Sequence, residues 1–150
     1  MEVTLRDATL ADAQFLFDLR TDPTVISASN RPAPPTETDH AVWLTISLMD
    51  LDHIRLFIID VDGVIAGQCR LDRDAKHTAE VSIALVRAAR GQGVGTVALR
   101  ELARRANDLG VRWLEAVIKE TNMPSRKAFL NAGFSVEEIG DGLVHMSLKC

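Results

Sequence analysis

The sequence contains no tyrosine and only two cysteines. Without tyrosine, no phenol hydroxyl is available to donate a proton in catalysis. Cys69 lies in a strand-like run and Cys150 is the last residue, which gives neither metal-ligand spacing nor the disulfide framework of a small secreted protein. We expect no metal site, and we interpret Cys69 as a core residue because no neighbour would activate its thiol.

Neither an excess of positive charge nor a long apolar run is present. Seventeen Lys and Arg stand against 21 Asp and Glu, and the net charge of −4 gives no global field that would attract nucleic acid or an anionic membrane. No apolar run approaches the roughly 18 residues of a membrane span, and residues 1–7 carry charge where a signal peptide needs an apolar segment. We therefore expect a cytoplasmic protein without nucleic-acid or membrane partners.

The residues that are present suffice for one folded unit. Of the 150 residues, 47% are hydrophobic and 25% are charged, which is the profile of a globular domain with its own core. No internal repeat, low-complexity tract or linker interrupts the chain, so we expect a single domain over residues 1–150.

Hydrophobic periodicity predicts one mixed sheet with helices around it. Thr9-x-x-Asp12 and Thr36-x-x-Asp39 have the pattern of capping boxes, and Asp22-Pro23 is expected to end the first helix. Three β-rich runs are joined by turns too short for a parallel crossover, so they should form an antiparallel meander. The expected elements are, in order, a strand over 2–6, a helix over 9–19, a loop over 27–35, a helix over 36–48, strands over 54–61, 64–71 and 78–86, a helix after residue 96, a strand over 113–118, a helix over 124–132 and a hairpin over 134–148.

The helix after residue 96 has a clear amphipathic pattern. Gly110 is expected to end it, because glycine favours the residue that follows a helix. An apolar stripe should face the core, and four charged residues should face water. The stripe comprises Leu99, Leu102, Ala103, Ala106 and Leu109, and the charged residues are Arg100, Glu101, Arg104 and Arg105.

A glycine-rich turn precedes this helix. Gly91, Gly93 and Gly95 fall within five residues, which lets the backbone approach a ligand while the free N–H groups of the helix start point at it. Such a nest, reinforced by the helix dipole, suits a phosphate or pyrophosphate. The alternative is a tight strand-to-helix corner that holds no ligand.

Two familiar phosphate motifs do not fit the turn. The nucleotide P-loop needs a lysine immediately before the Ser or Thr of the helix start, and here Gly95 precedes Thr96. The dinucleotide fingerprint needs a third glycine where Thr96 stands, and it normally lies in a parallel βαβ unit rather than after a meander. The turn therefore predicts a phosphate site of another kind.

The segment Arg90-x-x-Gly93-x-Gly95 resembles the acetyl-coenzyme A signature of the GNAT superfamily of N-acetyltransferases. A second segment, Asn122-x-x-Ser125-x-x-x-Phe129-x-x-x-Gly133-Phe134, is similar to the C-terminal element of the same superfamily. The resemblance extends over the whole chain. It implies an α/β (α+β) fold with a single mixed, mostly antiparallel sheet of about seven strands, splayed between strands 4 and 5 and flanked by four helices.

The resemblance also implies acetyl-coenzyme A as cosubstrate and a set of residues that bind it. The main chain of residues 90–96 would hold the pyrophosphate, and residues 83–85 would hydrogen-bond the pantetheine arm in the gap between the splayed strands. The implied coenzyme contacts are Ile83, Ala84, Leu85, Arg90, Gly91, Gln92, Gly93, Val94, Gly95, Thr96, Asn122, Ser125 and Phe129.

A narrower likeness concerns the acceptor. Leu19-Arg20-Thr21-Asp22-Pro23, Asp39-His40-x-x-Trp43, Arg55-Leu56-Phe57-Ile58 and Gly67-Gln68-x-Arg70-Leu71-Asp72-Arg73 resemble a GNAT subgroup of nonulosonic-acid pathways, whose members acetylate an amino group of a nucleotide-linked deoxysugar. The early helices and the loop over 27–35 should cover the acceptor side. The candidate acceptor contacts are Arg20, Asp22, Asn30, Arg31, His40 and Trp43, each of which is alternatively a helix-end ion pair or a core side chain.

Acetyl transfer needs a base for the amine, a donor for the oxyanion and a proton for the thiolate. Glu80 is the first candidate base, and the alternative is a surface carboxylate; His40 and His77 are weaker candidates. The main-chain N–H of Leu85 is the candidate oxyanion donor. Many relatives place a tyrosine at the position of Phe129, so here water or another group must protonate the thiolate, or it leaves unprotonated. The missing phenol favours a weakly basic amine such as that of an amino sugar.

Other functions stay open at this stage. The acceptor amine could belong to a protein N-terminus or a lysine, and Phe129 is also consistent with a noncatalytic acyl-coenzyme A-binding module. A third alternative is a nucleotide-binding protein with no acetyl transfer. Members of the fold often pair through their C-terminal strands, so a homodimer is one possible assembly.

Overall fold

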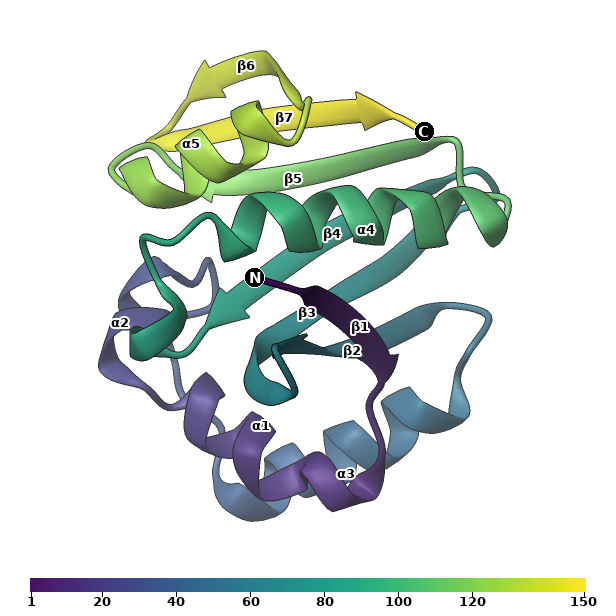
Figure 1. Ribbon diagram of the computed structural model, residues 1–150, viewed down its shortest axis with the longest axis vertical. Coiled ribbons are helices and arrows are strands. Elements are labelled where there is room, and N and C mark those ends of the chain that lie inside the picture. The colour runs from purple at the N-terminus through teal and green to yellow at the C-terminus, as the bar shows by residue number, and fades with distance from the viewer.

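The computed structural model describes residues 1–150 and contains one seven-stranded sheet. The strand order is β1-β2-β3-β4-β5-β7-β6, and the β4–β5 pair is parallel while the other five pairs are antiparallel. The predicted mixed, mostly antiparallel sheet is therefore confirmed (Figure 1). The strands are β1 (Val3–Asp7), β2 (Ile54–Val61), β3 (Val64–Ala75), β4 (Thr78–Leu85), β5 (Trp113–Lys119), β6 (Ser135–Gly140) and β7 (Leu143–Lys149).

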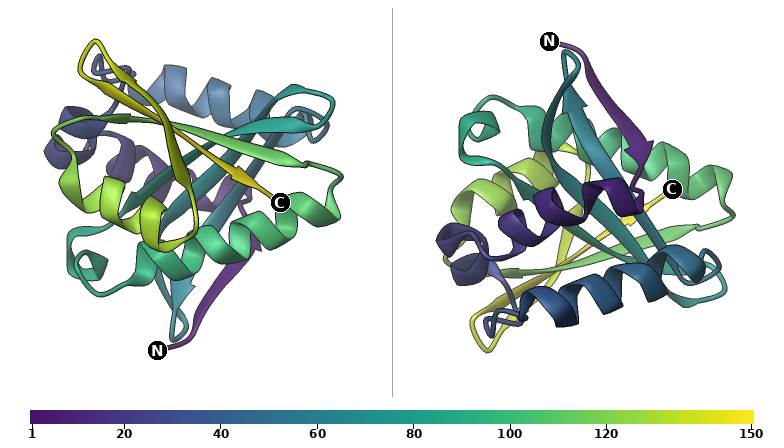
Figure 2. Two further views of the ribbon diagram at one scale, coloured as in Figure 1. Left: turned by 90° about the horizontal axis from the view of Figure 1, so that it is seen from above. Right: turned by 90° about the horizontal axis from the view of Figure 1, so that it is seen from below.

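Helices cover both faces of the sheet (Figure 2). Alternate residues of β2 pack on opposite sides, since Phe57 joins the core beneath α4 and α5 whereas Leu56 and Ile58 join the core beneath α1 and α3. A strand buried on both faces reads as a continuous apolar run, which is the pattern of 56–59. The helices are α1 (Ala13–Arg20), α2 (Pro23–Ala28), α3 (Glu37–Met49), α4 (Val94–Asp108) and α5 (Met123–Asn131), with single 3-10 turns at Leu10–Asp12 and Arg87–Ala89.

The expectation of four helices is wrong by one, because α2 is an additional helix. Asp22-Pro23 was expected only to end the first helix, yet α1 ends at Arg20 and a second short helix begins at Pro23. The Asp22 carboxylate accepts hydrogen bonds from the N–H groups of Thr24 and Val25, and proline is favoured at the first helical position. The same two residues therefore also start a helix, and the expected loop over 27–35 begins two residues later than predicted.

The other predicted boundaries hold closely, except that β3 continues four residues past its predicted end, to Ala75. Thr9 and Asp12 form both hydrogen bonds of a capping box, which opens the 3-10 turn before α1. Asp62 and Gly63 have φ angles of 50° and 82° and make the tight β2–β3 turn. Gly110, at a φ angle of 85°, follows the end of α4 as expected. No helix of the structure is long and apolar enough to cross a membrane.

The predicted splay between the fourth and fifth strands is present. β4 and β5 pair only over Thr78–Glu80 and Trp113–Glu115. Beyond that, β4 runs to Leu85 and β5 runs to Lys119 without pairing to each other. The two strands therefore leave a wedge-shaped gap in the middle of the sheet, closed at Glu80 and open towards the start of α4.

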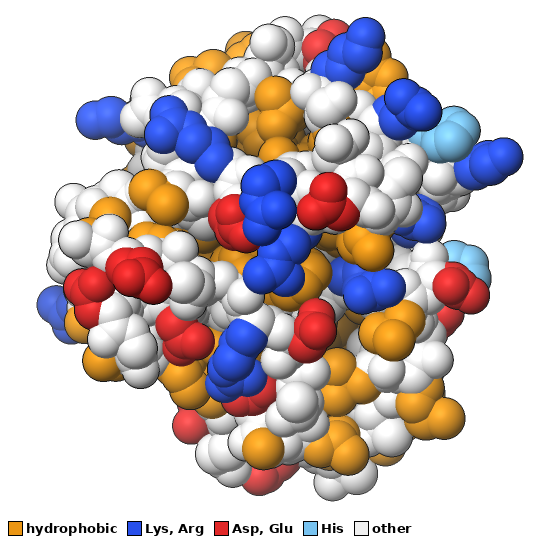
Figure 3. Space-filling view, turned by 45° about the vertical axis from the view of Figure 1, so that its right-hand side comes forward, with side chains coloured by type: hydrophobic (Ala, Val, Ile, Leu, Met, Phe, Trp, Pro, Cys, Tyr) orange, Lys and Arg blue, Asp and Glu red, His pale blue; other side chains and the backbone are white.

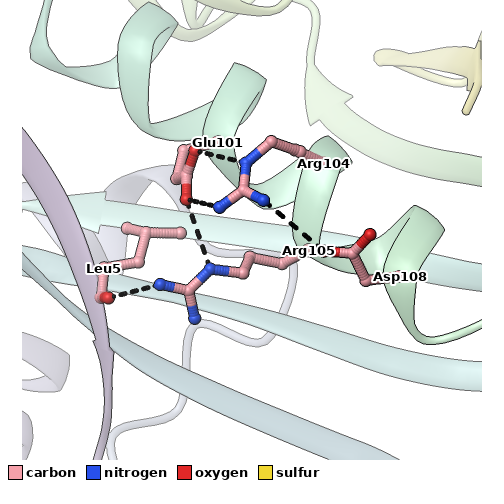
Figure 4. Close-up of polar contacts among 5 residues, drawn as sticks. All are labelled: Leu5, Glu101, Arg104, Arg105 and Asp108. Atoms are coloured by element: carbon pink, nitrogen blue, oxygen red, sulfur yellow. Dashed lines mark hydrogen bonds and ion pairs between the residues drawn. The ribbon is translucent and has the colours of Figure 1, made fainter.

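The charged face of α4 is only partly in water, which corrects one expectation. Arg105 was expected to face solvent, but its Nη2 donates to the Leu5 carbonyl of β1 at 2.8 Å and its Nε lies 3.2 Å from Glu101 (Figure 4). Its guanidinium also stacks 5.6 Å from the centre of the Phe57 ring. The aliphatic stem is long enough to reach across to the edge strand, so Arg105 fastens α4 to β1.

Replacing Arg105 by alanine should lower the free energy of unfolding by about 1–3 kcal/mol, because a carbonyl hydrogen bond and a cation–π contact are lost together. Arg104 is the matched control: its side chain is 61% exposed, against 33% for Arg105, and it pairs only with residues of its own helix. Arg104→Ala should change stability by no more than about 1 kcal/mol. Urea unfolding of both variants checks the difference, and equal losses would contradict it.

Candidate active site

The glycine-rich turn at the open end of the gap presents a row of free main-chain amides. Gly91 and Gly93 have φ angles of 74° and 81°, and Gly93 is the N-cap of α4 without any side-chain cap. None of the six N–H groups from Gly91 to Thr96 donates a hydrogen bond to another group of the chain. Unpaired amides at the positive end of a 15-residue helix are suited to an anion with several oxygens.

Open space lies in front of this turn. A Cβ atom added to Gly91 or Gly93 would meet no other heavy atom within 4 Å. On the face drawn in Figure 3, acidic and basic side chains are interspersed, so no broad single-sign field covers that face. The turn therefore offers main-chain amides and open space to an anion, and phosphate binding there stays a prediction.

The Arg90 side chain turns away from the amide row. Its Nε donates to the Leu85 carbonyl at 3.0 Å, and its Nη2 lies 3.3 Å from Asp22 Oδ1. Asp22 thus caps α2 and pairs with Arg90, and the hydrogen bond from Val25 and that from Arg90 hold the pKa of its carboxyl below the usual range. Asp22 was predicted as an acceptor contact, but here its carboxylate joins α2 to the glycine-rich turn.

The predicted pantetheine contacts on β4 differ in where their main-chain groups point. The N–H of Val86 donates to the Ala66 carbonyl at 2.9 Å, so it points to β3. Since main-chain groups alternate sides along a strand, those of Ile83 and Leu85 point into the gap and those of Ala84 point to β3. Ile83 can thus offer both main-chain groups to a ligand in the gap, whereas Leu85 offers its N–H, because its carbonyl already accepts from Arg90 Nε. Ala84 offers only its side chain.

The predicted contacts on α5 differ in exposure. The Asn122 side chain caps α5 by accepting from the Ser125 N–H at 3.3 Å, and both residues are half-buried. Phe129 is 2% exposed and packs edge to face on Phe134, with ring centres 4.9 Å apart. Its ring is part of the core beneath α4 and α5, so its contact with a coenzyme remains a prediction.

Glu80 stands at the closed end of the gap. It is the last residue of β4 that pairs with β5, it is exposed, and its carboxylate makes no hydrogen bond or ion pair with the chain. Asp72 of β3 and Glu115 of β5 are its partners on either side. Burial, Asp74 and then Glu80 raise the pKa of the Glu115 carboxyl. The sequence did not indicate this acidic group, because only the strand register brings its members together.

The irregular segment 29–36 spans the two sides of the gap. Arg20 Nη2 of α1 donates to the carbonyls of Arg31 and Ala33, at 2.6 and 3.3 Å. On the far side, Asn30 Nδ2 donates to the Val117 carbonyl of β5 at 2.9 Å. Arg20 and Asn30 therefore position the loop across the gap on the side of α1 and α3, where the acceptor was expected.

Both histidine candidates contact other groups of the chain. His40 is 6% exposed and lies between the rings of Phe17 and Trp43, with centroid separations of 5.6 and 5.4 Å. Burial, and then the charge of Arg20, lower the pKa of His40, so the ring is neutral at pH 7. His77 Nδ1 lies 3.3 Å from the Gly110 carbonyl, in the turn before β4, away from the open end of the gap.

The sequence predicted the place of Cys69 in the core but did not predict Arg70 on the acceptor side. Cys69 is fully buried, and burial raises the pKa of its thiol far above the ordinary value, which agrees with its interpretation as a core residue.

Arg70 was not among the predicted site residues, although its guanidinium lies 5.4 Å from the centre of the Trp43 ring. Only the register of β3 against β4, which places Arg70 opposite Ser82, brings it to the acceptor side.

Comparisons with known proteins give a consistent result. A family model described as the acetyltransferase (GNAT) domain matches residues 2–135. YwnH of Bacillus subtilis (strain 168), whose phosphinothricin acetyltransferase activity is itself a provisional assignment, is 44% identical over 72 residues. This match covers 48% of the present chain and 44%, less than half, of YwnH.

Two solved structures are similar in fold over nearly the whole chain. A GNAT superfamily phosphinothricin acetyltransferase from Sinorhizobium meliloti, in complex with acetyl-coenzyme A, has a TM-score of 0.82 at 24% identity and covers 99% of this chain and 89% of its own. The aminoglycoside acetyltransferase AAC(6')-Ib, in complex with coenzyme A and kanamycin, has a TM-score of 0.83 at 20% identity, with 99% and 95% covered.

Proposed function

Because this chain belongs to the GNAT acetyltransferase family, we propose that it moves the acetyl group of acetyl-coenzyme A onto a primary amine of a small molecule. The observation that carries the proposal is the row of six free amides from Gly91 to Thr96 at the open end of the gap. Main-chain amides at a helix start suit the pyrophosphate of the coenzyme, and the gap beside β4 suits its pantetheine arm.

The main chain of residues 90–96 holds the pyrophosphate in this proposal, while Ile83 and Leu85 hydrogen-bond the pantetheine arm through their gap-facing groups. Asn122 and Ser125, half-buried at the start of α5, lie on the β5 side of the coenzyme. The arm then runs along β4 towards the closed end of the gap, which brings the thioester to the neighbourhood of Glu80.

The chemistry proposed for this place is direct transfer. When bound, acetyl-coenzyme A supplies a thioester whose carbonyl carbon accepts the amine nitrogen. Glu80 takes the proton that the nitrogen loses as the C–N bond forms, directly or through water. Leu85, predicted as the oxyanion donor, lies five residues from Glu80, about 17 Å along β4, so its N–H cannot reach a thioester beside Glu80 and is left to the pantetheine arm. As the C–S bond breaks, the sulfur leaves as a thiolate and water protonates it, since a thiol pKa near ~8.5 permits that departure.

For the acceptor we propose an amino group of a nucleotide-linked amino sugar. The support is the likeness of the segments around Arg20, His40 and Arg70 to the subgroup that acts on such sugars, together with the absence of tyrosine. An amine on a sugar ring is less basic than a lysine, so a weaker set of acid and base groups is sufficient. Phosphinothricin and kanamycin, which appear in the descriptions of the similar proteins, are the comparison acceptors.

Release of free thiol from acetyl-coenzyme A tests the proposed function. We expect turnover with a nucleotide-linked amino sugar that exceeds turnover with phosphinothricin, kanamycin, a peptide N-terminus and a lysine peptide. Faster acetylation of a peptide would move the acceptor class to proteins. Coenzyme binding without turnover on any of these amines would contradict the proposed enzymatic activity and favour an acyl-coenzyme A-binding module.

A further inference from the structure

Three arginines gather on the acceptor side with few counter-charges. Burial, and then the charges of Arg70 and Arg31, lower the pKa of Arg20. The three guanidiniums therefore lie close enough to repel one another. Asp72 is the one carboxylate paired with any of them, at 2.7 Å from Arg70 Nε, and the nearby His40 is neutral at pH 7. The group therefore carries an excess of positive charge.

One atom of this group has no partner. Arg20 Nη1 is buried from water and makes no hydrogen bond, although Nη2 of the same guanidinium holds the carbonyls of Arg31 and Ala33. A buried N–H of a charged group without an acceptor is strongly unfavourable, so structures normally supply one. Nothing in the chain supplies it here, so the Arg20 guanidinium keeps one unused N–H on the acceptor side.

Arg70 connects this place to the proposed chemistry. It lies opposite Ser82 of β4, and Glu80 is two residues along the same strand, on the same face of the sheet. Two residues of a strand span about 7 Å. Trp43 lies beneath the Arg70 guanidinium and fixes its orientation, leaving its two Nη groups without partners in the chain.

We propose that the acceptor is an anion, whose phosphate or carboxylate group is bound by Arg20 and Arg70 while its amine reaches Glu80. Two guanidiniums present forks that match the oxygens of either group. The inference rests on the proposed acetyl transfer and restricts its acceptor to amines that carry negative charge. It favours a phosphorylated amino sugar or an acidic amino acid, and it disfavours a polycation such as kanamycin, which would meet three arginines.

Matched acceptor pairs test the proposal. Glucosamine 1-phosphate differs from glucosamine by a phosphate, and glutamate differs from glutamine by a carboxylate, so the two pairs separate the sources of negative charge. The wild-type protein should prefer the charged member of at least one pair by at least about tenfold in kcat/KM, the effect of one charge-assisted hydrogen bond. Arg70→Gln should reduce that preference about tenfold, and Arg70→Lys should restore part of it.

Arg55 provides the control. It lies on the neighbouring strand β2 opposite Leu71, on the face away from Arg70, so Arg55→Gln removes the same charge without touching the proposed site. Arg55→Gln should keep the wild-type preference. Equal preferences in wild type and Arg70→Gln, or an equal loss in Arg55→Gln, would overturn the proposal.

A binding measurement separates this inference from the proposed function. With the coenzyme site saturated by coenzyme A, inorganic pyrophosphate should raise the melting temperature of the wild-type protein and leave that of Arg70→Gln unchanged. If no amine is acetylated but this difference is found, the anion site stands and the proposed function fails. If pyrophosphate stabilises both proteins equally, the anion site is wrong even where acetylation is observed.

Discussion

Replacing Gly93 by valine is expected to weaken coenzyme A binding by at least about 100-fold, or about 2.7 kcal/mol. Gly93 has a φ angle of 81°, which a β-branched residue does not adopt, so the turn must rearrange. Rearrangement moves the amides of Val94, Gly95 and Thr96 out of line, and one or two charge-assisted hydrogen bonds account for the predicted loss. Titration calorimetry with coenzyme A measures it.

Gly110 is the matched control for this substitution. Its φ angle is 85°, an added Cβ meets no heavy atom within 4 Å, and it lies at the opposite end of α4. Gly110→Val should therefore lower stability about as much as Gly93→Val, by roughly 1–2 kcal/mol, with little change in coenzyme affinity. If both variants lose the same coenzyme affinity, the loss comes from destabilisation of α4 and not from the displaced amides.

Replacing Glu80 by glutamine is expected to lower kcat by about 10²- to 10⁴-fold, the usual contribution of a positioned general base. Glutamine keeps the size of the side chain but cannot take a proton. The carboxylate is exposed and has no partner in the chain, so its loss should leave the fold and the coenzyme affinity unchanged. Steady-state thiol release, with calorimetry for the coenzyme, separates the two effects.

Glu115 on the neighbouring strand serves as the control for Glu80. It faces Glu80 on the last paired rung and contributes the same negative charge to the closed end of the gap. Glu115→Gln should reduce kcat by less than about tenfold, because a change of field alone is weaker than the loss of a proton acceptor. A drop as large as that of Glu80→Gln would assign the effect to charge and remove Glu80 from the proposed chemistry.

Local patterns predicted most of the fold. The capping box at Thr9, the turn at Asp62-Gly63 and the glycine after α4 each depend on residues within a few positions of one another. The glycine-rich turn predicted an anion site for the same reason, since positive φ angles and free amides are properties of a short segment. These features could be predicted because their causes lie in the local sequence.

Contacts between distant segments could not be predicted in this way. Arg105 was expected in water because its helix position is polar, and only the packing of α4 beside β1 gives it the Leu5 carbonyl. Arg90 pairs with Asp22 across 68 positions of the chain. The gap-facing directions of Ile83 and Leu85 depend on which ladder position β4 takes against β3. In each case the partner is determined by register or packing, which the hydrophobic pattern does not specify.

In the proposed function the amides from Gly91 to Thr96 hold the pyrophosphate of the coenzyme. Amide proton and nitrogen chemical shifts, followed while coenzyme A is added to the folded protein, report on each of these amides separately. We expect the largest shifts at Gly91, Gly93 and Gly95, with Gly110 and Gly142 nearly unchanged. Coenzyme A binding that leaves the resonances of 91–96 in place would show that these amides do not hold the pyrophosphate.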